Sequence, residues 1–209
     1  MKLLKVQNII NLAFKFVTYT SKKYNIDESH ALKHSMEVFH FAKNIYNEEV
    51  KNKLYLKNQF DIIALSSITH DMCDRKYINQ DIGLKYINTT FTPYLELDKM
   101  QTVNNIISSM SYSKVKKDGY PNLGNYQHTY HIVREADLLS AYDIDRCIIF
   151  AMIVEKMNYT DAVNRAIELF NNRVLKYRED SLFVTNYSKN KSLQLHNKAL
   201  NDIKILMNK

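Results

Sequence analysis

The near-absence of residues that break helices restricts the fold of this chain more than any other feature. Its 209 residues include only 3 glycines and 2 prolines, whereas apolar residues make up 45% of the total. Glycine and proline usually interrupt helices and mark turns, so this sequence favours long helices joined by short connections. A chain of this length is also long enough to bury one substantial hydrophobic core. We therefore predict an all-α protein.

Apolar residues recur at intervals of three and four along most of the chain, which predicts amphipathic helices. We expect a bundle of roughly eight helices, with boundaries uncertain by about two to four residues. Residues 144–157 are almost wholly apolar, and we expect their helix to lie at the centre. The other expected helices cover approximately 3–23, 28–49, 60–71, 80–90, 97–110, 128–141, 160–176 and 181–208.

We expect a single domain over residues 1–209, with a core of about 25–180 and the helix of about 181–208 packed on it. Residues 111–127 contain two of the three glycines, and they predict the clearest loop. A loop of this length inside a compact domain is often functional. Lys114 and Lys117 could bind phosphate there, or they could belong to a solvated run of charge.

Charge and cysteine content restrict the partners and the compartment. The formal net charge of +7 suits a phosphorylated substrate or, less specifically, nucleic acid, although a lysine-rich solvated surface explains it equally well. Cys73 and Cys147 form no CxxC motif, which favours a reducing compartment. No stretch has the roughly 20 apolar residues needed to cross a membrane, and no signal peptide is recognisable. We expect a cytoplasmic protein without membrane contacts, and the sequence leaves its oligomeric state open.

A histidine followed directly by an aspartate closes the apolar run of residues 62–68. His70 and Asp71 would thus be carried into the interior. His34 lies on the apolar stripe of the expected 28–49 helix, together with His30. Asp137 stands among apolar residues, where a bare carboxylate is costly unless it is paired or bound to metal. Imidazole and carboxylate together suit Mn, Fe, Ni, Co or Zn, although a single inward histidine is more often a hydrogen-bonded core residue.

The order of these residues resembles the HD-domain superfamily of metal-dependent phosphohydrolases, whose signature is H…HD…D. Residues 29–38, SHALKHSMEV, are similar to the H-D-x-x-H-x-x-R-V segment of its small bacterial-type members, and residues 70–76, HDMCDRK, are similar to H-D-x-x-D-x-K. Residues 135–141, EADLLSA, resemble D-A-D-R-L-D-A, and segments 106–112 and 185–196 are similar as well. The likeness covers nearly the whole chain, with departures at Ala31, Glu37, Leu138 and Ser140.

The resemblance implies a single HD-domain helical bundle that hydrolyses a phosphoester, most naturally of a nucleotide or a related small phosphorylated metabolite. It also implies one divalent metal ion, which could be Mn, Mg, Co, Ni, Fe or Zn. The ligands that the motif assigns to this ion are His34, His70, Asp71 and Asp137.

The resemblance further implies roles for residues around the metal ligands. Asp74 and Asp71 would carry the catalysis, because related hydrolases have an acidic residue at the position of Asp74 that handles a proton. Arg75 and Lys76 would neutralise substrate phosphate, and His30 would orient the substrate. In a simpler interpretation, Asp74 is a helix-end carboxylate paired with Arg75 or Lys76.

Two other functions compete with hydrolysis. The chain could be a catalytically weak or inactive HD protein that acts as a nucleotide- or nucleic-acid-binding regulatory module. The net charge and the departures beside Asp137 favour this alternative, whereas the complete ligand set and the absence of a concentrated basic stripe argue against it. A di-iron oxygenase would need more ligands. His128 and His131 are available, but nothing in the sequence places them at the site.

Overall fold

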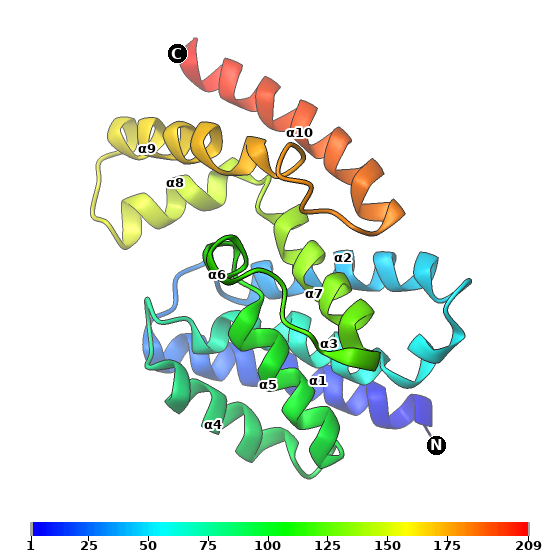
Figure 1. Ribbon diagram of the computed structural model, residues 1–209. Helices are drawn as coiled ribbons and strands as arrows, with labels where there is room; N and C mark the ends of the chain where they lie inside the picture. The colour runs from blue at the N-terminus through cyan, green and yellow to red at the C-terminus, as the bar shows by residue number, and fades with distance from the viewer. Residues whose placement is uncertain (1, 209) are drawn as a thin grey trace.

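The computed structural model describes residues 2–208, and every regular element in this range is a helix (Figure 1). The all-α prediction is confirmed, with ten α-helices in that range rather than roughly eight. The α-helices are α1 (Lys2–Tyr24), α2 (Leu32–Glu49), α3 (Phe60–Thr69), α4 (Gln80–Phe91), α5 (Leu97–Ser109), α6 (Tyr112–Asp118), α7 (Gln127–Ser140), α8 (Ile144–Ile153), α9 (Tyr159–Asn172) and α10 (Asn186–Met207). Short 3-10 helices are η1 (Leu54–Asn58), η2 (His70–Cys73), η3 (Gly124–Tyr126) and η4 (Val174–Lys176).

The main hydrophobic core lies within a bundle of α1 to α5 that is closed by α7. Helix α3 is at its centre, and every residue from Ile62 to Thr69 is buried. Helix α1 packs against α3, and its residues Ile9, Ala13 and Val17, spaced four apart, have no exposed surface. The core therefore begins well before residue 25, because the apolar face of the first helix is part of it.

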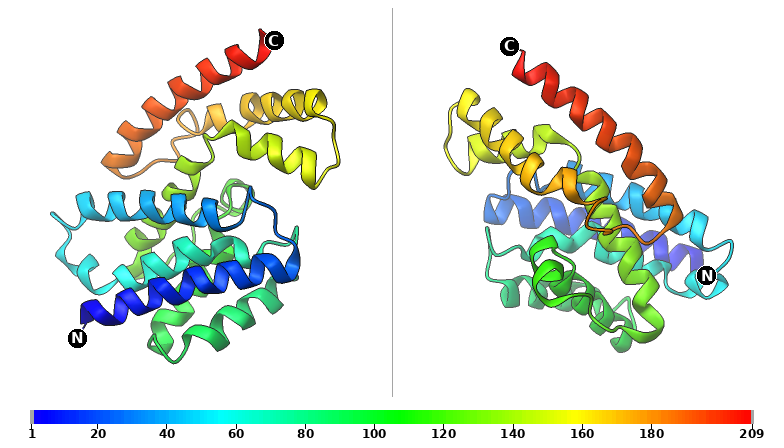
Figure 2. Two further views of the ribbon diagram at one scale, coloured as in Figure 1. Left: turned by 180° about the vertical axis from the view of Figure 1, so that it is seen from behind. Right: turned by 45° about the horizontal axis from the view of Figure 1, so that its top comes forward.

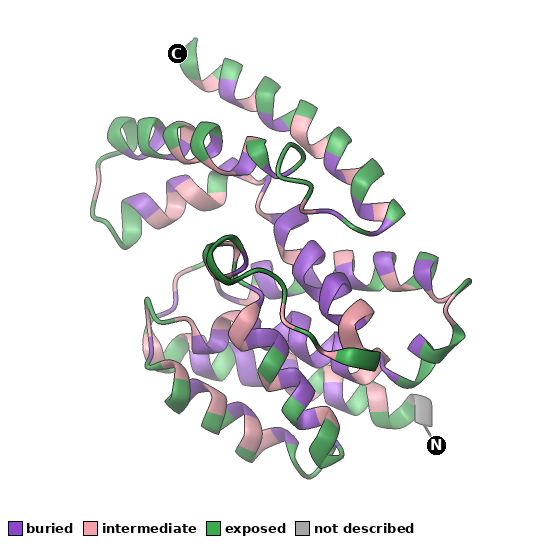
Figure 3. Cartoon of the chain, viewed as in Figure 1, coloured by how far each residue is buried: buried purple, intermediate pink, exposed green. Residues whose placement is uncertain are grey.

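Helix α7 is the central helix of the molecule, with almost all of its surface covered (Figure 3). It even buries an ion pair, in which an Arg134 nitrogen lies 3.6 Å from a Glu135 oxygen. The Glu135 carboxylate accepts hydrogen bonds from the backbone N–H groups of Val184 and Thr185 at 2.7 and 3.1 Å and from the Thr185 hydroxyl at 2.7 Å. These contacts satisfy a charge that would be expensive to bury alone, and they fix the chain just before α10.

Helices α8, α9 and α10 form a second layer that Figures 1 and 2 show above the bundle. The prediction that the apolar helix of residues 144–157 is central is therefore wrong. Helix α8 packs mainly against α9, and the residues at its C-terminal end, Met152, Ile153 and Val154, are 38–48% exposed. Its apolar composition serves the contact with α9 and the wall of a cavity rather than the main core.

The segment expected as a loop, residues 111–127, contains helix α6 and the 3-10 turn η3. Ser111 caps α6 by accepting a hydrogen bond from the backbone N–H of Lys114. Gly119 ends the helix with φ of +75°, a left-handed conformation that glycine adopts without strain. Lys114 and Lys117 thus lie on a helix and not on a loop. In the part of the chain that the structure describes, no helix is both long and apolar enough to cross a membrane.

Candidate metal centre

Three elements bring the predicted ligands together. The buried face of α2 carries His34, the turn η2 carries His70 and Asp71, and the C-terminal half of α7 carries Asp137. Helix α3 ends at Thr69, so His70 and Asp71 lie on a tighter 3-10 turn rather than on the last turn of α3. This turn continues the apolar run that holds α3 in the core, and it thereby fixes both side chains.

The donor atoms of these side chains converge on one point. Among the described residues, His34, His70 and Asp137 form a group whose donor atoms all lie within 4.8 Å of one another. The Nε2 atoms of the two histidines are 3.1 Å apart, and each lies 3.6 Å from Asp137 Oδ1. Asp71 places Oδ2 3.2 Å from His34 Nε2 and Oδ1 3.4 Å from His70 Nε2. Ligands about 2.1 Å from one metal ion would be separated by about 3.0–3.4 Å, which is close to these spacings.

Hydrogen bonds on the far side of each ring fix the histidine tautomers. His70 Nδ1 lies 3.0 Å from the Ser67 carbonyl oxygen, which can only accept, so this nitrogen carries a hydrogen. The Ser140 hydroxyl donates to the Asp137 carbonyl oxygen at 2.9 Å, so its oxygen accepts from His34 Nδ1 at 3.4 Å. In its neutral form each ring therefore presents the Nε2 lone pair to the centre, which is the form that binds metal.

A buried oxygen at the centre lacks a hydrogen-bond partner. Asp71 Oδ2 is inaccessible and accepts no hydrogen bond from any described residue, although His34 Nε2 lies 3.2 Å away. His34 cannot donate to it, because the hydrogen of that ring is on Nδ1. Two lone-pair atoms thus face each other at this distance, and a cation between them would satisfy both. His34, His70 and Asp137, with Asp71 beside both imidazoles, fit a divalent metal ion of the kind that binds nitrogen and oxygen donors.

The pKa values of the two histidines and of Asp71 reflect burial and the charges gathered at this centre. Burial disfavours the charged form of His34, and nearby Arg146 acts in the same direction, so the pKa of His34 falls to about 4. Burial also lowers the pKa of His70, but the carboxylates of Asp71 and Asp137 have the larger, opposite effect and raise this pKa to about 9. Without metal, His70 therefore holds a proton that the carboxylates stabilise. Burial opposes ionisation of Asp71, yet the neighbouring histidines keep its pKa well below the usual range.

The centre opens into a cavity of about 900 Å³, whose lining residues come from the bundle and from the α8–α9 layer. Its wall includes side chains or backbone of every predicted catalytic and substrate-binding residue. These are His30, Asp71, Asp74, Arg75, Lys76, Lys114 and Lys117.

Asp74 follows η2 in an extended conformation rather than one helical turn beyond Asp71. One of its oxygens accepts the backbone N–H of Lys76 at 2.9 Å, and the other lies 3.1 Å from the Lys76 ammonium nitrogen. This is the pairing of the simpler interpretation, although the carboxylate also lines the cavity. Arg75 does not take part, because its guanidinium donates to Gln80 Oε1 at 2.9 and 3.2 Å.

His30 lies in the turn before α2 and not on the helical stripe with His34. Its Nε2 lies 3.1 Å from the Lys76 ammonium, which can only donate, so Nε2 accepts and Nδ1 carries the hydrogen. Nδ1 then lies 2.6 Å from the Ser29 hydroxyl and 3.1 Å from that of Tyr77. His30 therefore holds Lys76 beside the metal centre without contributing a ligand.

Comparisons with known proteins give no relative for this chain. No protein-family model matches it, and neither does any curated protein or solved structure. The interpretation of the site therefore rests on its residues and their geometry.

Sequence reasoning missed the residues that the second layer adds. Arg146 of α8 donates to the Ser29 carbonyl at 2.8 Å and to the Ser140 hydroxyl at 3.2 Å. Phe150, one turn further along, lies under the Lys76 ammonium, 5.3 Å from the ring centroid. An arginine inside an otherwise apolar helix is a signal that could have indicated Arg146. Arg173, which lines the same cavity just after α9, has no comparable local signal.

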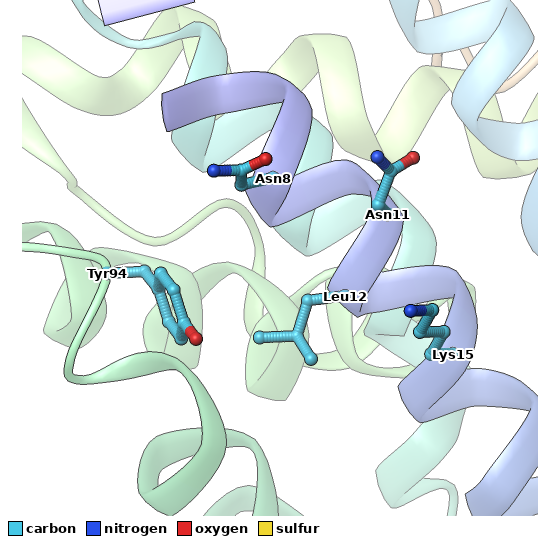
Figure 4. Close-up of a pocket in the computed structure, with 5 residues that line it drawn as sticks. All are labelled: Asn8, Asn11, Leu12, Lys15 and Tyr94. Carbon is cyan, nitrogen blue, oxygen red and sulfur yellow. The ribbon is translucent and has the colours of Figure 1, made fainter. Parts of the chain in front are cut away.

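Two other places are poor candidates for metal. His128 lies 2.7 Å from a Glu49 oxygen that also pairs with Lys53, and His131 contacts Gln127 at 3.3 Å, so neither supplies a second metal site to the centre. A shallower depression of about 280 Å³ lies against α1 (Figure 4). It has no histidine or carboxylate in its lining, which consists of Asn8, Asn11, Leu12, Lys15 and Tyr94.

Proposed function

We propose that this protein is a metal-dependent phosphohydrolase that cleaves a phosphoester of a small metabolite, such as a nucleotide. The observation that carries the proposal is the arrangement at the centre. Two Nε2 lone pairs and two carboxylates converge at one end of a cavity that lysines and arginines also line. Such a site attracts a divalent cation at one point and an anion beside it. The resemblance to the H…HD…D signature supports the same function.

The metal would be held by His34, His70, Asp71 and Asp137, and Mn or a neighbouring divalent ion suits this donor set. A divalent ion there supplies Lewis-acid polarisation of a phosphoryl oxygen and of a water molecule. Ser67 and Ser140 keep both imidazoles in the coordinating tautomer. The chain thus prepares the centre before substrate binds, which is how enzymes avoid paying for reorganisation during the reaction.

The remaining residues have roles that follow from their contacts. Lys76 is held at the cavity wall between Asp74 and His30, where its ammonium can neutralise a phosphate oxygen. Lys114 and Lys117 bring two more cations from α6. Asp74 would exchange a proton with water or the leaving group, and its contacts with Lys76 orient the carboxylate.

An activity screen with Mn-loaded protein tests this function. Phosphomonoesters, phosphodiesters and nucleotides would be offered in parallel to the parent protein and to the Asp137→Asn variant. This substitution removes the charge of the proposed ligand and keeps the shape of the side chain. We expect release of phosphate or a phosphorylated product from at least one class, dependent on added metal and lost in Asp137→Asn. Tight metal binding without turnover of any class would contradict the proposal and favour the regulatory binding module.

A further inference from the structure

Two arginines of the second layer point to a part of the cavity that the metal centre does not explain. Arg146 lies on α8 and Arg173 directly follows α9, and both line the cavity. Their hydrogen-bond partners are neutral oxygens. Arg146 donates to the Ser29 carbonyl and the Ser140 hydroxyl, and Arg173 Nε donates to the Tyr177 hydroxyl at 3.1 Å.

Two other cations of the cavity wall, Lys76 and Arg165, have a carboxylate partner. Lys76 lies 3.1 Å from an Asp74 oxygen, and Arg165 lies 3.6 Å from a Glu155 oxygen. Within residues 2–208, neither Arg146 nor Arg173 has a carboxylate oxygen within 4.0 Å. Asp143 also lines the cavity, but its side chain caps α8 through the backbone N–H of Asp145 at 3.2 Å. Both arginines are only partly exposed, and a partly buried cation without a counter-ion is costly.

The two guanidinium groups line the same cavity, and their contacts orient them. The Arg173 carbon atom Cζ lies 4.6 Å from the centre of the Tyr112 ring, which fixes the plane of the group. Cys147 lines the cavity together with both arginines. Burial raises the pKa of its thiol, and the two positive charges act against this rise. A guanidinium has five N–H donors, so most donors of both groups remain available to an anion.

We propose that Arg146 and Arg173 bind a second phosphate group of the substrate, separate from the one at the metal centre. The substrate would then carry two phosphates, and the α8–α9 layer would select against compounds that carry one. Arginine suits this task, because its planar fork binds two phosphate oxygens at once. The inference rests on the proposed function, since it assigns the other phosphate to the metal centre.

The two phosphates could be linked directly or could stand on separate carbon atoms. Non-hydrolysable probes distinguish these cases, namely methylphosphonate, methylenediphosphonate and longer alkane-α,ω-bisphosphonates. Their binding to Mn-loaded protein would be measured by calorimetry at a fixed free Mn²⁺ concentration. We expect methylphosphonate to bind only when metal is present, and one bisphosphonate to bind about ten- to a hundredfold more tightly. The best linker length identifies the type of substrate.

Three variants test whether the two arginines cause the higher affinity for the bisphosphonate. Arg146→Gln and Arg173→Gln should each remove most of the gain in affinity for the bisphosphonate. Arg173→Gln should also leave methylphosphonate binding within about twofold. Arg165→Gln is the matched control, because this arginine lines the same cavity but is already paired with Glu155. It should keep the gain. If circular dichroism shows that Arg146→Gln is unfolded, Arg173→Gln alone is sufficient for the test. The Arg173 side chain contacts Tyr177 and Tyr112, neither of which supports a proposed metal ligand.

The outcomes separate this inference from the proposed function. If methylphosphonate binds with metal but no bisphosphonate binds more tightly, the second phosphate site is wrong and the proposed function stands. If all three variants lose the gain equally, the assignment to Arg146 and Arg173 is wrong, because any nearby charge would then suffice. If methylphosphonate itself does not bind the metal-loaded protein, the proposed function is contradicted.

Discussion

At the scale of single residues, His70 holds the proton that a metal ion would replace. Its pKa is raised to about 9, since Asp71 and Asp137 outweigh the effect of burial, whereas the pKa of His34 is lowered to about 4. Between these values one of the two rings is protonated, and metal binding must release that proton. We therefore expect metal affinity to rise about tenfold per pH unit from pH 6 to pH 9 and then to level off.

Calorimetry in buffers with different ionisation enthalpies would measure the proton released per metal ion bound. We expect about one proton near pH 7 and almost none above pH 10. The sign follows from the raised pKa, because low pH stabilises the protonated, metal-free form of His70. An affinity that is flat between pH 6 and pH 9 would show that His70 is neutral before metal binds.

Asp74 tests whether proton transfer can be separated from metal binding. Asp74→Asn keeps the shape of the side chain and removes both its charge and its pairing with Lys76. We expect metal content to be retained and kcat to fall by about 10²–10⁴-fold, the usual contribution of a general acid or base. Steady-state kinetics and metal analysis of the same sample would check this. A variant that turns over like the parent would mean that Asp74 only positions Lys76.

The grouping of His34, His70 and Asp137 could be predicted from the sequence, whereas the contacts that support these side chains could not. The order of the three residues along the chain, with Asp71 beside His70, was the signal. Ser140 instead looked like the loss of a polar neighbour. Its hydroxyl in fact joins His34 to Arg146, a contact between residues over a hundred positions apart that no local pattern encodes.

At the scale of elements, the close packing of α4 against η2 positions the metal ligands of that turn. Gly83 of α4 lies so close to Cys73 that a Cβ atom on it would be 2.5 Å from Cys73 Cβ and 2.7 Å from its Cα. Gly83→Ala must therefore displace η2, which carries His70 and Asp71. We expect a loss of about 1–3 kcal/mol in the free energy of unfolding, together with a weaker metal affinity.

Gly124→Ala provides the control for this change. Gly124 has φ of +53° and open space around its Cα, so alanine costs about 1–2 kcal/mol of backbone strain there. That strain is outside the metal centre, and metal affinity should not change. Denaturant unfolding and metal titration of both variants would decide. Equal metal affinity in Gly83→Ala and the parent would show that η2 is not held by α4.

The buried Glu135 tests how α7 joins the two layers. Its carboxylate is fully buried and accepts three hydrogen bonds from Val184 and Thr185. Glu135→Ala leaves the backbone N–H groups of Val184 and Thr185 without their acceptor and Arg134 without its carboxylate, so we expect a loss of about 3–5 kcal/mol. Asp202→Ala removes a largely exposed pair with Lys198 and should cost less than about 0.5 kcal/mol. Urea denaturation measures both, and similar costs would contradict this role.

Helical periodicity predicted most of the helices but not how deeply each one is buried. The stripes of α2 and α5 were recognisable because one face of each meets the core. The apolar run of α8 suggested a central helix, yet an apolar helix can also pack on one neighbour and line a cavity. Helix α6 was missed because its lysines and the nearby glycines are typical of a loop, although Ser111 was a capping signal.

At the scale of the whole molecule, the bundle holds the metal centre and the second layer covers it. Donors come from α2, η2 and α7, so the centre exists only when these elements are packed together. The second layer adds the arginines that would distinguish one substrate from another. The proposed function would thus place catalysis and selectivity in different parts of one chain, with α7 connecting them (Figure 1).

Metal stoichiometry tests the central claim most directly. Parent protein, His34→Ala, Asp137→Asn and Asp74→Asn would each be stripped, reloaded with Mn²⁺, dialysed and analysed by elemental mass spectrometry. We expect about one ion per chain in the parent and in Asp74→Asn, and strongly reduced occupancy in the two ligand variants, because each loses one of only four donors. Circular dichroism would confirm that the variants are folded. A parent protein without bound metal, or ligand variants that retain the parent's content, would contradict the metal centre described above.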